Sequence, residues 1–265
     1  MKKKTVDEIF DYENKLIGAD TPFHVTEAFK TLRTNVYYTS SDEKCPVYGI
    51  TSAFAHAGKS VIISNLALSF AQMEKKVLLI DADMRRPAII KIFGKKESKG
   101  LSDMIIGAKN ENDSFENYVI PSGYDRLDIM LSGRIPPNPS ELLANVNFRK
   151  YIAEMKEKYD FIFIDLPPIC EVTDAGVIAD FVDGYLLAVR SEVTDRRALD
   201  DALSLLDKMK ARIIGFVMNG VDPKAGGYGS YKYGRKYGKY GKYYQYGYHN
   251  YANSQKEAEK AGSNK

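Results

Sequence analysis

Short apolar runs that alternate with helix-like stretches constrain the fold of this chain more than any other feature. The runs are rich in Val, Ile, Leu and Phe and cover residues 47–53, 77–83, 127–131, 161–165, 185–189 and 213–219. Because they are nearly continuous, they predict strands covered on both faces. Helices are predicted between them, at 61–72, 141–159 and 196–210. This alternation predicts an α/β fold with a doubly wound, mostly parallel sheet flanked by helices.

The chain divides into three parts. Residues 1–45 are polar, with one helical pattern from about 26 to 38, and residues 46–222 contain the alternating runs. Residues 223–265 include a tract of Gly, Lys and Tyr with no periodicity that could form a core. We therefore predict an N-terminal segment, one α/β domain and a disordered, Tyr-rich C-terminal tail.

Composition excludes several classes of function. The formal net charge of +3 is too small to indicate a nucleic-acid partner, and we expect none. No apolar run approaches the roughly 20 residues that span a bilayer, so membrane association would require a partner. Cys45 and Cys170 have no metal-binding or redox spacing. Together with the lack of a signal-peptide pattern, they indicate a cytoplasmic location.

The segment TSAFAHAGKSV, residues 51–61, joins the first run to a helical stretch. It ends in Gly58-Lys59-Ser60, as a phosphate-binding P-loop does, but Ala53 replaces the first glycine of that pattern. At a helix start, backbone N–H groups point at an anion, while Lys59 adds positive charge and Ser60 a hydroxyl for Mg²⁺. The alternative is an ordinary strand-to-helix turn.

Acidic residues end two of the predicted strands. Asp81 and Asp83 end the run VLLIDAD, and Asp165 ends FIFID. Ligands of open α/β sheets bind at the carboxyl ends of the strands, and residues two apart on a strand share a face. Each acid alone could be a turn or capping residue. Together with the Gly-Lys-Ser triplet, they favour a magnesium–nucleotide site.

These motifs, with EAFKTLRTN at 27–35 and a terminal tyrosine cluster, resemble the bacterial tyrosine kinases of capsule and exopolysaccharide synthesis. The resemblance is to the separate cytoplasmic kinase of Gram-positive bacteria and covers about residues 20–251. It implies a P-loop NTPase-like fold that uses ATP and Mg²⁺. The implied enzyme autophosphorylates its own tail tyrosines, mainly between subunits, and regulates the polymerisation and export of the polysaccharide.

By position, the resemblance assigns roles to individual residues. Lys59, Asp81, Asp83 and Asp165 would be catalytic, with Asp81 orienting or deprotonating the attacking tyrosine hydroxyl. Such a hydroxyl, with a pKa near 10, needs a proton acceptor at neutral pH. Ser60, Asp83 and Asp165 would hold Mg²⁺ directly or through water. The residues that would contact the nucleotide are Ala57, Gly58, Lys59, Ser60, Val61 and Asn219.

The loop departs from the pattern of the family it resembles. Relatives usually carry Pro-Gly-Glu at the positions of Ala55, His56 and Ala57, and a second hydroxyl residue at Val61. A lost neutral hydrogen bond costs roughly 0.5–1.5 kcal/mol, and His at a position that needs positive φ costs about 1 kcal/mol. We expect a loop whose ATP binding is weakened by about one to two orders of magnitude but still works. The alternative is a pseudokinase.

The predicted tail suits a substrate role. Its tyrosines are Tyr228, Tyr231, Tyr233, Tyr237, Tyr240, Tyr243, Tyr244, Tyr246, Tyr248 and Tyr251. From Lys224 to Tyr251 there are six Lys and Arg residues and no acidic ones. Phosphorylation at about −1.5 per site would change a charge near +6 to about −9. A flexible 25-residue segment spans roughly 25–30 Å, so distal tyrosines should reach a neighbouring subunit best. The alternative is a tract that binds RNA or a partner protein.

Glu27, Lys30 and Arg33 lie three residues apart on one predicted helix face. Such a stripe is often a solvated face, but the resemblance implies that it builds a ring-like homo-oligomer, possibly an octamer. Lys30 stands where relatives have arginine, and a lysine cannot form the bidentate hydrogen bonds that a guanidinium group forms. Other implied partners are a transmembrane polysaccharide co-polymerase, whose cytoplasmic end activates the kinase at the membrane, and a tyrosine phosphatase.

Two other functions compete with this interpretation. Division- and partition-type positioning ATPases (MinD/ParA-like) share the fold and both acidic motifs. They carry a signature lysine at the position of Phe54 and need no tyrosine tail. A non-catalytic scaffold whose tail recruits partners is the second alternative.

Overall fold

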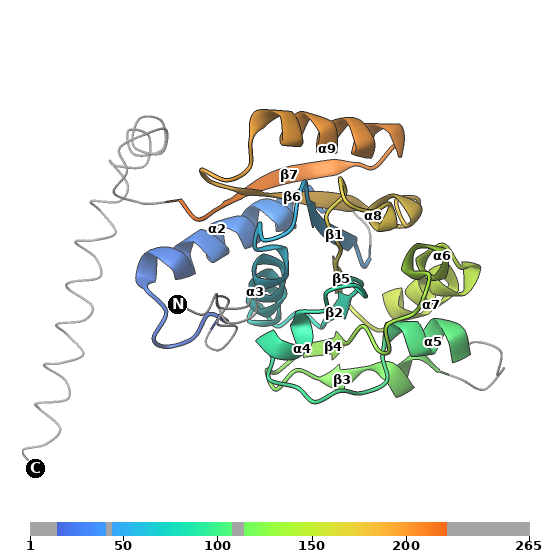
Figure 1. Ribbon diagram of the computed structural model, residues 1–265. Helices are drawn as coiled ribbons and strands as arrows, with labels where there is room; N and C mark the ends of the chain where they lie inside the picture. Colours follow the sequence, from blue (N-terminus) through green and yellow to red (C-terminus); the bar gives the residue numbers. More distant parts are fainter. Residues whose placement is uncertain (1–14, 41–43, 108–113, 222–265) are drawn as a thin grey trace, which may run out of the picture. The chain divides into compact units, whose positions relative to one another are not determined.

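The computed structural model describes residues 15–40, 44–107 and 114–221 of the chain. Within these residues one sheet of seven strands has the order β3-β4-β2-β5-β1-β6-β7 (Figure 1). The neighbouring strands are parallel except for the antiparallel pair β3 and β4. The strands are β1 (Val47–Ser52), β2 (Val77–Asp81), β3 (Ile120–Pro121), β4 (Leu127–Met130), β5 (Phe161–Asp165), β6 (Gly184–Arg190) and β7 (Ile213–Asn219).

Helices cover both faces of the sheet. One face packs against α2 (Phe23–Thr39), α3 (Lys59–Ala71) and α4 (Ile89–Ile92). The other packs against α5 (Leu101–Gly107), the 3-10 helix η1 (Phe115–Tyr118), α6 (Pro139–Leu143), α7 (Val146–Lys156), α8 (Asp174–Val177) and α9 (Arg196–Lys208). The predicted α/β fold with a doubly wound, mostly parallel sheet is therefore confirmed.

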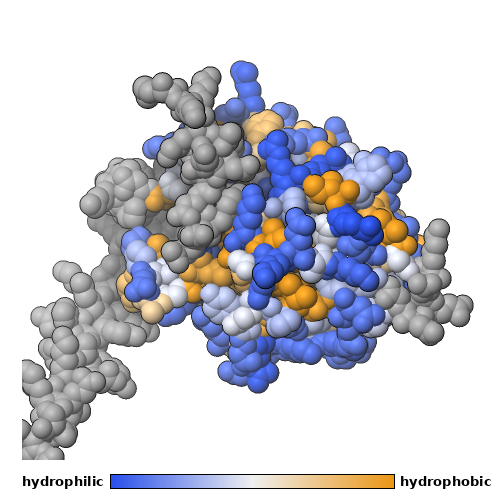
Figure 2. Space-filling view, turned by 60° about the horizontal axis from the view of Figure 1, so that its bottom comes forward, coloured by the Kyte–Doolittle hydropathy of each residue, from blue (hydrophilic) through white to orange (hydrophobic). Residues whose placement is uncertain are grey.

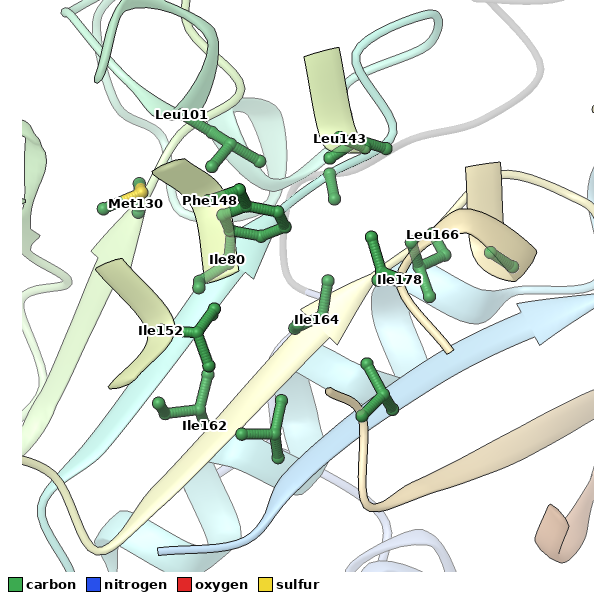
Figure 3. Close-up of a cluster of buried hydrophobic side chains, with 14 of the residues drawn as sticks. Ile80, Leu101, Met130, Leu143, Phe148, Ile152, Ile162, Ile164, Leu166 and Ile178 are labelled. Carbon is green, nitrogen blue, oxygen red and sulfur yellow. The ribbon is translucent and has the colours of Figure 1, made fainter. Parts of the chain in front are cut away.

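Two buried hydrophobic clusters, one on each face, hold these layers together. Figure 3 shows part of the cluster beneath α5 to α8, where strand side chains such as Ile80, Ile162 and Ile164 meet Phe148 and Ile152 of α7. Every residue of β1, β2 and β5 is buried. This double coverage explains why those segments are continuous apolar runs.

The elements differ from the prediction where they are short. All six predicted strands are present, whereas β3 was not predicted because it has two residues. The single helix expected over 141–159 is two helices, α6 and α7. The break lies at Asn145, whose side chain accepts a hydrogen bond from the Asn147 backbone N–H and caps α7.

The predicted N-terminal helix is α2, and it packs against the domain. Val36 is buried beside α3, and Arg33 Nη1 donates a hydrogen bond to the Ser69 carbonyl at 2.9 Å. Glu27 and Lys30 pair with each other at 2.7 Å with half-exposed side chains. The proposed oligomer contact and the divisions at 45/46 and 222/223 stay predictions. The predicted tail lies outside the described residues.

No described helix combines the length and the apolar character that crossing a bilayer requires. The face of the molecule in Figure 2 is mainly hydrophilic, with hydrophobic side chains gathered in small patches among the charged ones.

Candidate functional site: a phosphate loop above buried carboxylates

The loop between β1 and α3 has the backbone of a phosphate-binding turn. Gly58, at the N-cap of α3, has φ +91°. A Cβ at that position would also lie 2.1 Å from Asn219 Nδ2, so both conformation and packing require glycine there. His56 has φ +65°, which confirms that this position is left-handed and that a residue with a Cβ occupies it under strain.

Three side-chain contacts brace this loop. Asn219 Nδ2 donates to the Ala57 carbonyl at 3.0 Å, and Arg190 Nη1 donates to the His56 carbonyl at 2.9 Å. On the other side, the Ala55 N–H donates to Glu171 Oε1 at 2.9 Å. Asn219 therefore supports the loop, while its predicted nucleotide contact stays a prediction.

Sequence reasoning missed two of these braces. Arg190 ends β6 at the same sheet edge as the aspartates, so its position was a usable signal. Glu171 lies in the loop after β5 and offers no such signal.

Two of the predicted carboxylates face each other across neighbouring strands. Asp81 of β2 is opposite Asp165 of β5 in the register of the sheet, and both are fully buried. Asp81 Oδ2 accepts a hydrogen bond from the Ile89 N–H at 3.1 Å. Asp81 Oδ1 and both oxygens of Asp165 have no hydrogen-bond partner of normal geometry among the described residues. Buried polar atoms without partners are costly, which points to a ligand that satisfies them.

Burial controls the protonation of these groups. It raises the pKa of Asp165 to about 7, against the opposing effects of the Lys59 ammonium and the Ser60 hydroxyl. Burial, with the nearby Asp165 and Asp83 charges, also holds the pKa of Asp81 well above its ordinary value. The pKa of Asp83 is raised by burial as well, although the Lys59 charge and the Arg86 N–H oppose the shift. Lys59 is the buried cation of this cluster, and its charge acts on Asp83 and Asp165.

The loop and Asp83 line a cleft of about 360 Å³. Its lining residues are Ala55, His56, Gly58, Lys59, Ser60, Val61, Asp83, Arg85, Arg86, Ala88, Pro167, Pro168, Glu171 and Val172. The structure thus brings the predicted residues Lys59, Ser60 and Asp83 together at one opening. Asp81 and Asp165 are fully buried and do not line it. Arg85 is held by an ion pair with buried Asp174 at 3.3 Å.

The donor set fits Mg²⁺ bound together with a nucleotide. Among the described residues, no group of three or more His, Cys, Asp or Glu side chains is arranged to enclose a metal ion. Mg²⁺ in nucleotide sites commonly takes one or two carboxylates and completes its shell with water and phosphate oxygens. Ser60, Asp83 and Asp165, whose oxygens lack a partner of normal geometry in the described part of the chain, supply that kind of set.

This arrangement defines a P-loop nucleotide-binding protein: a strand leads into a Gly-Lys-Ser loop that opens a helix, and aspartates end the adjacent parallel strands. The sequence model of the AAA domain matches residues 55–213. "Tyrosine-protein kinase YwqD" of Bacillus subtilis (strain 168) is 37% identical over 195 residues, which cover 74% of this chain and 81% of that protein. The chain belongs to the bacterial tyrosine-protein kinase family.

Solved structures agree with this assignment. The kinase domain of Escherichia coli tyrosine kinase ETK matches with a TM-score of 0.71 and 31% identity, covering 78% of this chain and 80% of that one. The septum site-determining protein MinD of Pyrococcus horikoshii OT3, solved with Mg-ADP, matches with a TM-score of 0.54 and 21% identity. That match covers 66% of this chain and 70% of MinD, and it shows the fold alone.

Proposed function

We propose that this chain is an ATP-dependent protein-tyrosine kinase that phosphorylates the tyrosines of its own C-terminal tail, mainly between subunits. The observation that carries the proposal is the cluster of Lys59 and Ser60 with three buried carboxylates. Two of these carboxylates have oxygens without a partner of normal geometry among the residues that the structure describes. Phosphoryl transfer depends on in-line positioning and on neutralising charge, and this cluster supplies groups for both.

Each residue has a defined task in this proposal. The backbone N–H groups at the start of α3 and the Lys59 ammonium bind the β- and γ-phosphates. Ser60, Asp83 and Asp165 would hold Mg²⁺, which when bound would neutralise negative charge on the phosphate oxygens. The bond between the γ-phosphorus and the bridging β–γ oxygen breaks, a bond to the tyrosine oxygen forms, and ADP leaves.

The hydroxyl proton of the tyrosine requires a carboxylate acceptor. Asp81 Oδ1 has no partner of normal geometry within the described ranges, and the raised pKa of Asp81 makes it a better base than an ordinary aspartate. Because Asp81 is fully buried and does not line the cleft, a tyrosine hydroxyl reaches it only after the residues that cover it move. Asp81→Asn should therefore lower kcat with little change in ATP affinity, whereas Asp83→Asn should weaken Mg-ATP binding.

The test is to incubate the purified chain with Mg-ATP and locate modified residues by mass spectrometry. The kinase proposal expects phosphotyrosine that disappears in Lys59→Met and persists in Lys150→Met, which changes an exposed lysine of α7. ATP hydrolysis without phosphotyrosine would instead identify a positioning ATPase. Neither activity, even with the cytoplasmic end of a co-polymerase supplied, would identify a scaffold.

A pseudokinase scaffold is the second candidate, because two features of the loop favour it. His56 occupies a left-handed position, and Val61 offers no hydroxyl beside Ser60. We propose that the three braces of the loop compensate for this strain, so that activity is reduced rather than lost.

The proposed biological role follows from the family. We infer control of capsular or exopolysaccharide polymerisation and export, with activation by the cytoplasmic end of a transmembrane co-polymerase. This partner would recruit the chain to the inner face of the membrane. The same proposal includes a tyrosine phosphatase that removes the phosphates. It also includes a ring-like oligomer built through Glu27, Lys30 and Arg33. Deleting the gene should change polymer length, and a Lys59→Met chain should not restore it.

A further inference from the structure

A second, larger groove adjoins the nucleotide cleft. Its volume is about 1030 Å³, and it shares His56 and Arg86 with the cleft. It runs from the segment around α4 to the residues that follow β4. The residues that line it are His56, Arg86, Pro87, Ile90, Lys91, Glu97, Ser98, Leu131, Ser132, Gly133, Arg134 and Ile135. A segment bound in this groove would therefore end beside the phosphate loop.

The groove combines positive charge with apolar surface. Arg86 and Lys91 are exposed cations. Arg134 donates to Asp103 Oδ1 at 2.7 Å, which fixes it in place, yet its side chain remains 87% exposed. Glu97 in the lining and Asp103 beside Arg134 offset two of these three cations, so the groove has a small net positive charge. Ile135, 68% exposed, adds an apolar side chain against which an aromatic ring can pack.

The tyrosines of the tail fall into two halves of different charge. Residues 228–242 hold Tyr228, Tyr231, Tyr233, Tyr237 and Tyr240 with five Lys and Arg residues and no acidic ones. Residues 243–257 hold Tyr243, Tyr244, Tyr246, Tyr248 and Tyr251 with one Lys and one Glu. The two stretches thus have equal length and equal numbers of tyrosines, but formal charges of +5 and 0 with His neutral.

We propose that this groove is the acceptor site of the kinase and that its positive charge selects the neutral half of another copy's tail first. The proposal rests on the proposed kinase function and adds the residues that choose among its tyrosines. A basic groove repels residues 228–242 and accepts residues 243–257. Each phosphate adds −1.5 to −2 charges, so phosphates on the distal half then draw the basic half toward the groove. Modification proceeds from Tyr243–Tyr251 toward Tyr228.

Two synthetic peptides, residues 228–242 and 243–257, test the charge selection with the full-length chain and Mg-ATP. Because the cations of the groove repel the five Lys and Arg residues of the proximal peptide, we expect the KM of the distal peptide to be about tenfold lower at low salt. The difference in KM between the two peptides should shrink at about 0.5 M salt, because exposed charges are then screened. Equal KM values at low salt, or a lower KM for the proximal peptide, would overturn the proposal.

Lys91→Glu tests the groove itself, since Lys91 lines the groove but not the nucleotide cleft. The preference for the distal peptide should fall at least about threefold, while Lys150→Glu, the same charge change on α7, should leave it intact. If the two variants reduced the preference for the distal peptide equally, that preference would depend on the overall charge of the chain. The proposed role of the groove would then be wrong. Circular dichroism of both variants confirms that they fold.

A binding measurement separates this inference from the proposed function. Fluorescence anisotropy of labelled peptides, without ATP, should show the distal peptide binding more tightly whether or not transfer occurs. Suppose that neither peptide is phosphorylated, but the distal peptide binds more tightly and Lys91→Glu removes this preference. The proposed kinase function would then be wrong, and the proposed selection by the groove would be supported. If both are phosphorylated without a binding preference, the kinase function stands and the groove fails.

Discussion

Replacing Asp165 with asparagine should stabilise the chain in the absence of Mg²⁺ while abolishing phosphoryl transfer. Asp165 is fully buried opposite Asp81, and neither of its carboxylate oxygens has a hydrogen-bond partner of normal geometry among the described residues. Asparagine has nearly the same shape but carries no charge. The variant therefore removes a buried charge without removing packing.

The magnitude follows from the raised pKa. An acid whose pKa is higher in the folded than in the unfolded chain destabilises the fold above its unfolded value, because the unfolded chain ionises more readily. For Asp165 the pKa rises from 3.8 to about 7. At about 1.36 kcal/mol per pKa unit, the penalty grows between these values and reaches roughly 4 kcal/mol above pH 7. The attraction of Lys59 is already contained in this pKa, so we expect the variant to gain a few kcal/mol, at most about 4.

Urea unfolding followed by circular dichroism measures this gain, since the chain has no tryptophan to report by fluorescence. With EDTA present, Asp165→Asn should exceed the wild type in free energy of unfolding, and by more at pH 8 than at pH 5. Asp125→Asn, at an exposed turn before β4, is the matched control and should show neither effect. A variant less stable than the wild type at pH 8, or a difference independent of pH, would refute this account of the carboxylate pair.

Further predictions concern the altered loop and α2. Val61→Thr supplies a hydroxyl beside Ser60 and should tighten ATP binding up to about tenfold by calorimetry, whereas a gain of the same size in Val61→Ala would contradict the reasoning. His56→Gly removes about 1 kcal/mol of strain at φ +65° and should tighten ATP binding about fivefold; an unchanged affinity would mean that the strain is the same with and without nucleotide. Lys30→Ala should reduce the oligomer mass in analytical ultracentrifugation. Its melting temperature should fall by no more than about 2–4 °C, because the exposed pair with Glu27 contributes at most about 1 kcal/mol. An unchanged oligomer mass would exclude a role for the stripe.

Burial on both faces made the central strands predictable, whereas β7 was predicted from its apolar run although its residues are exposed or half-exposed. β1, β2 and β5 are entirely buried, so their sequences must be apolar throughout and are recognisable as runs. β3 has two residues and α4 and α8 have four each, which is too short for any periodicity to develop. The break between α6 and α7 depends on one capping side chain, Asn145.

The candidate site also has a part that the sequence predicts and a part that it does not. Lys59, Ser60 and the aspartates belong to local motifs, and the strand order brings them together because β2, β5 and β1 are neighbours. The braces were not visible because they join distant parts of the chain. Glu171 is 116 positions from Ala55, and Arg190 is 134 positions from His56. No local pattern encodes such a pair.

The hydrogen bond from Asn219 to the loop sets a limit on how the chain can be shortened. Asn219 is the last residue of β7, and the predicted tail begins only a few positions later. A truncation that ends at Met218 would remove the tyrosines together with a prop of the phosphate loop, and its inactivity would be misread as a requirement for the tail. Tail-free versions should therefore stop no earlier than Val221, so that any change in nucleotide binding reports on the missing tyrosines alone.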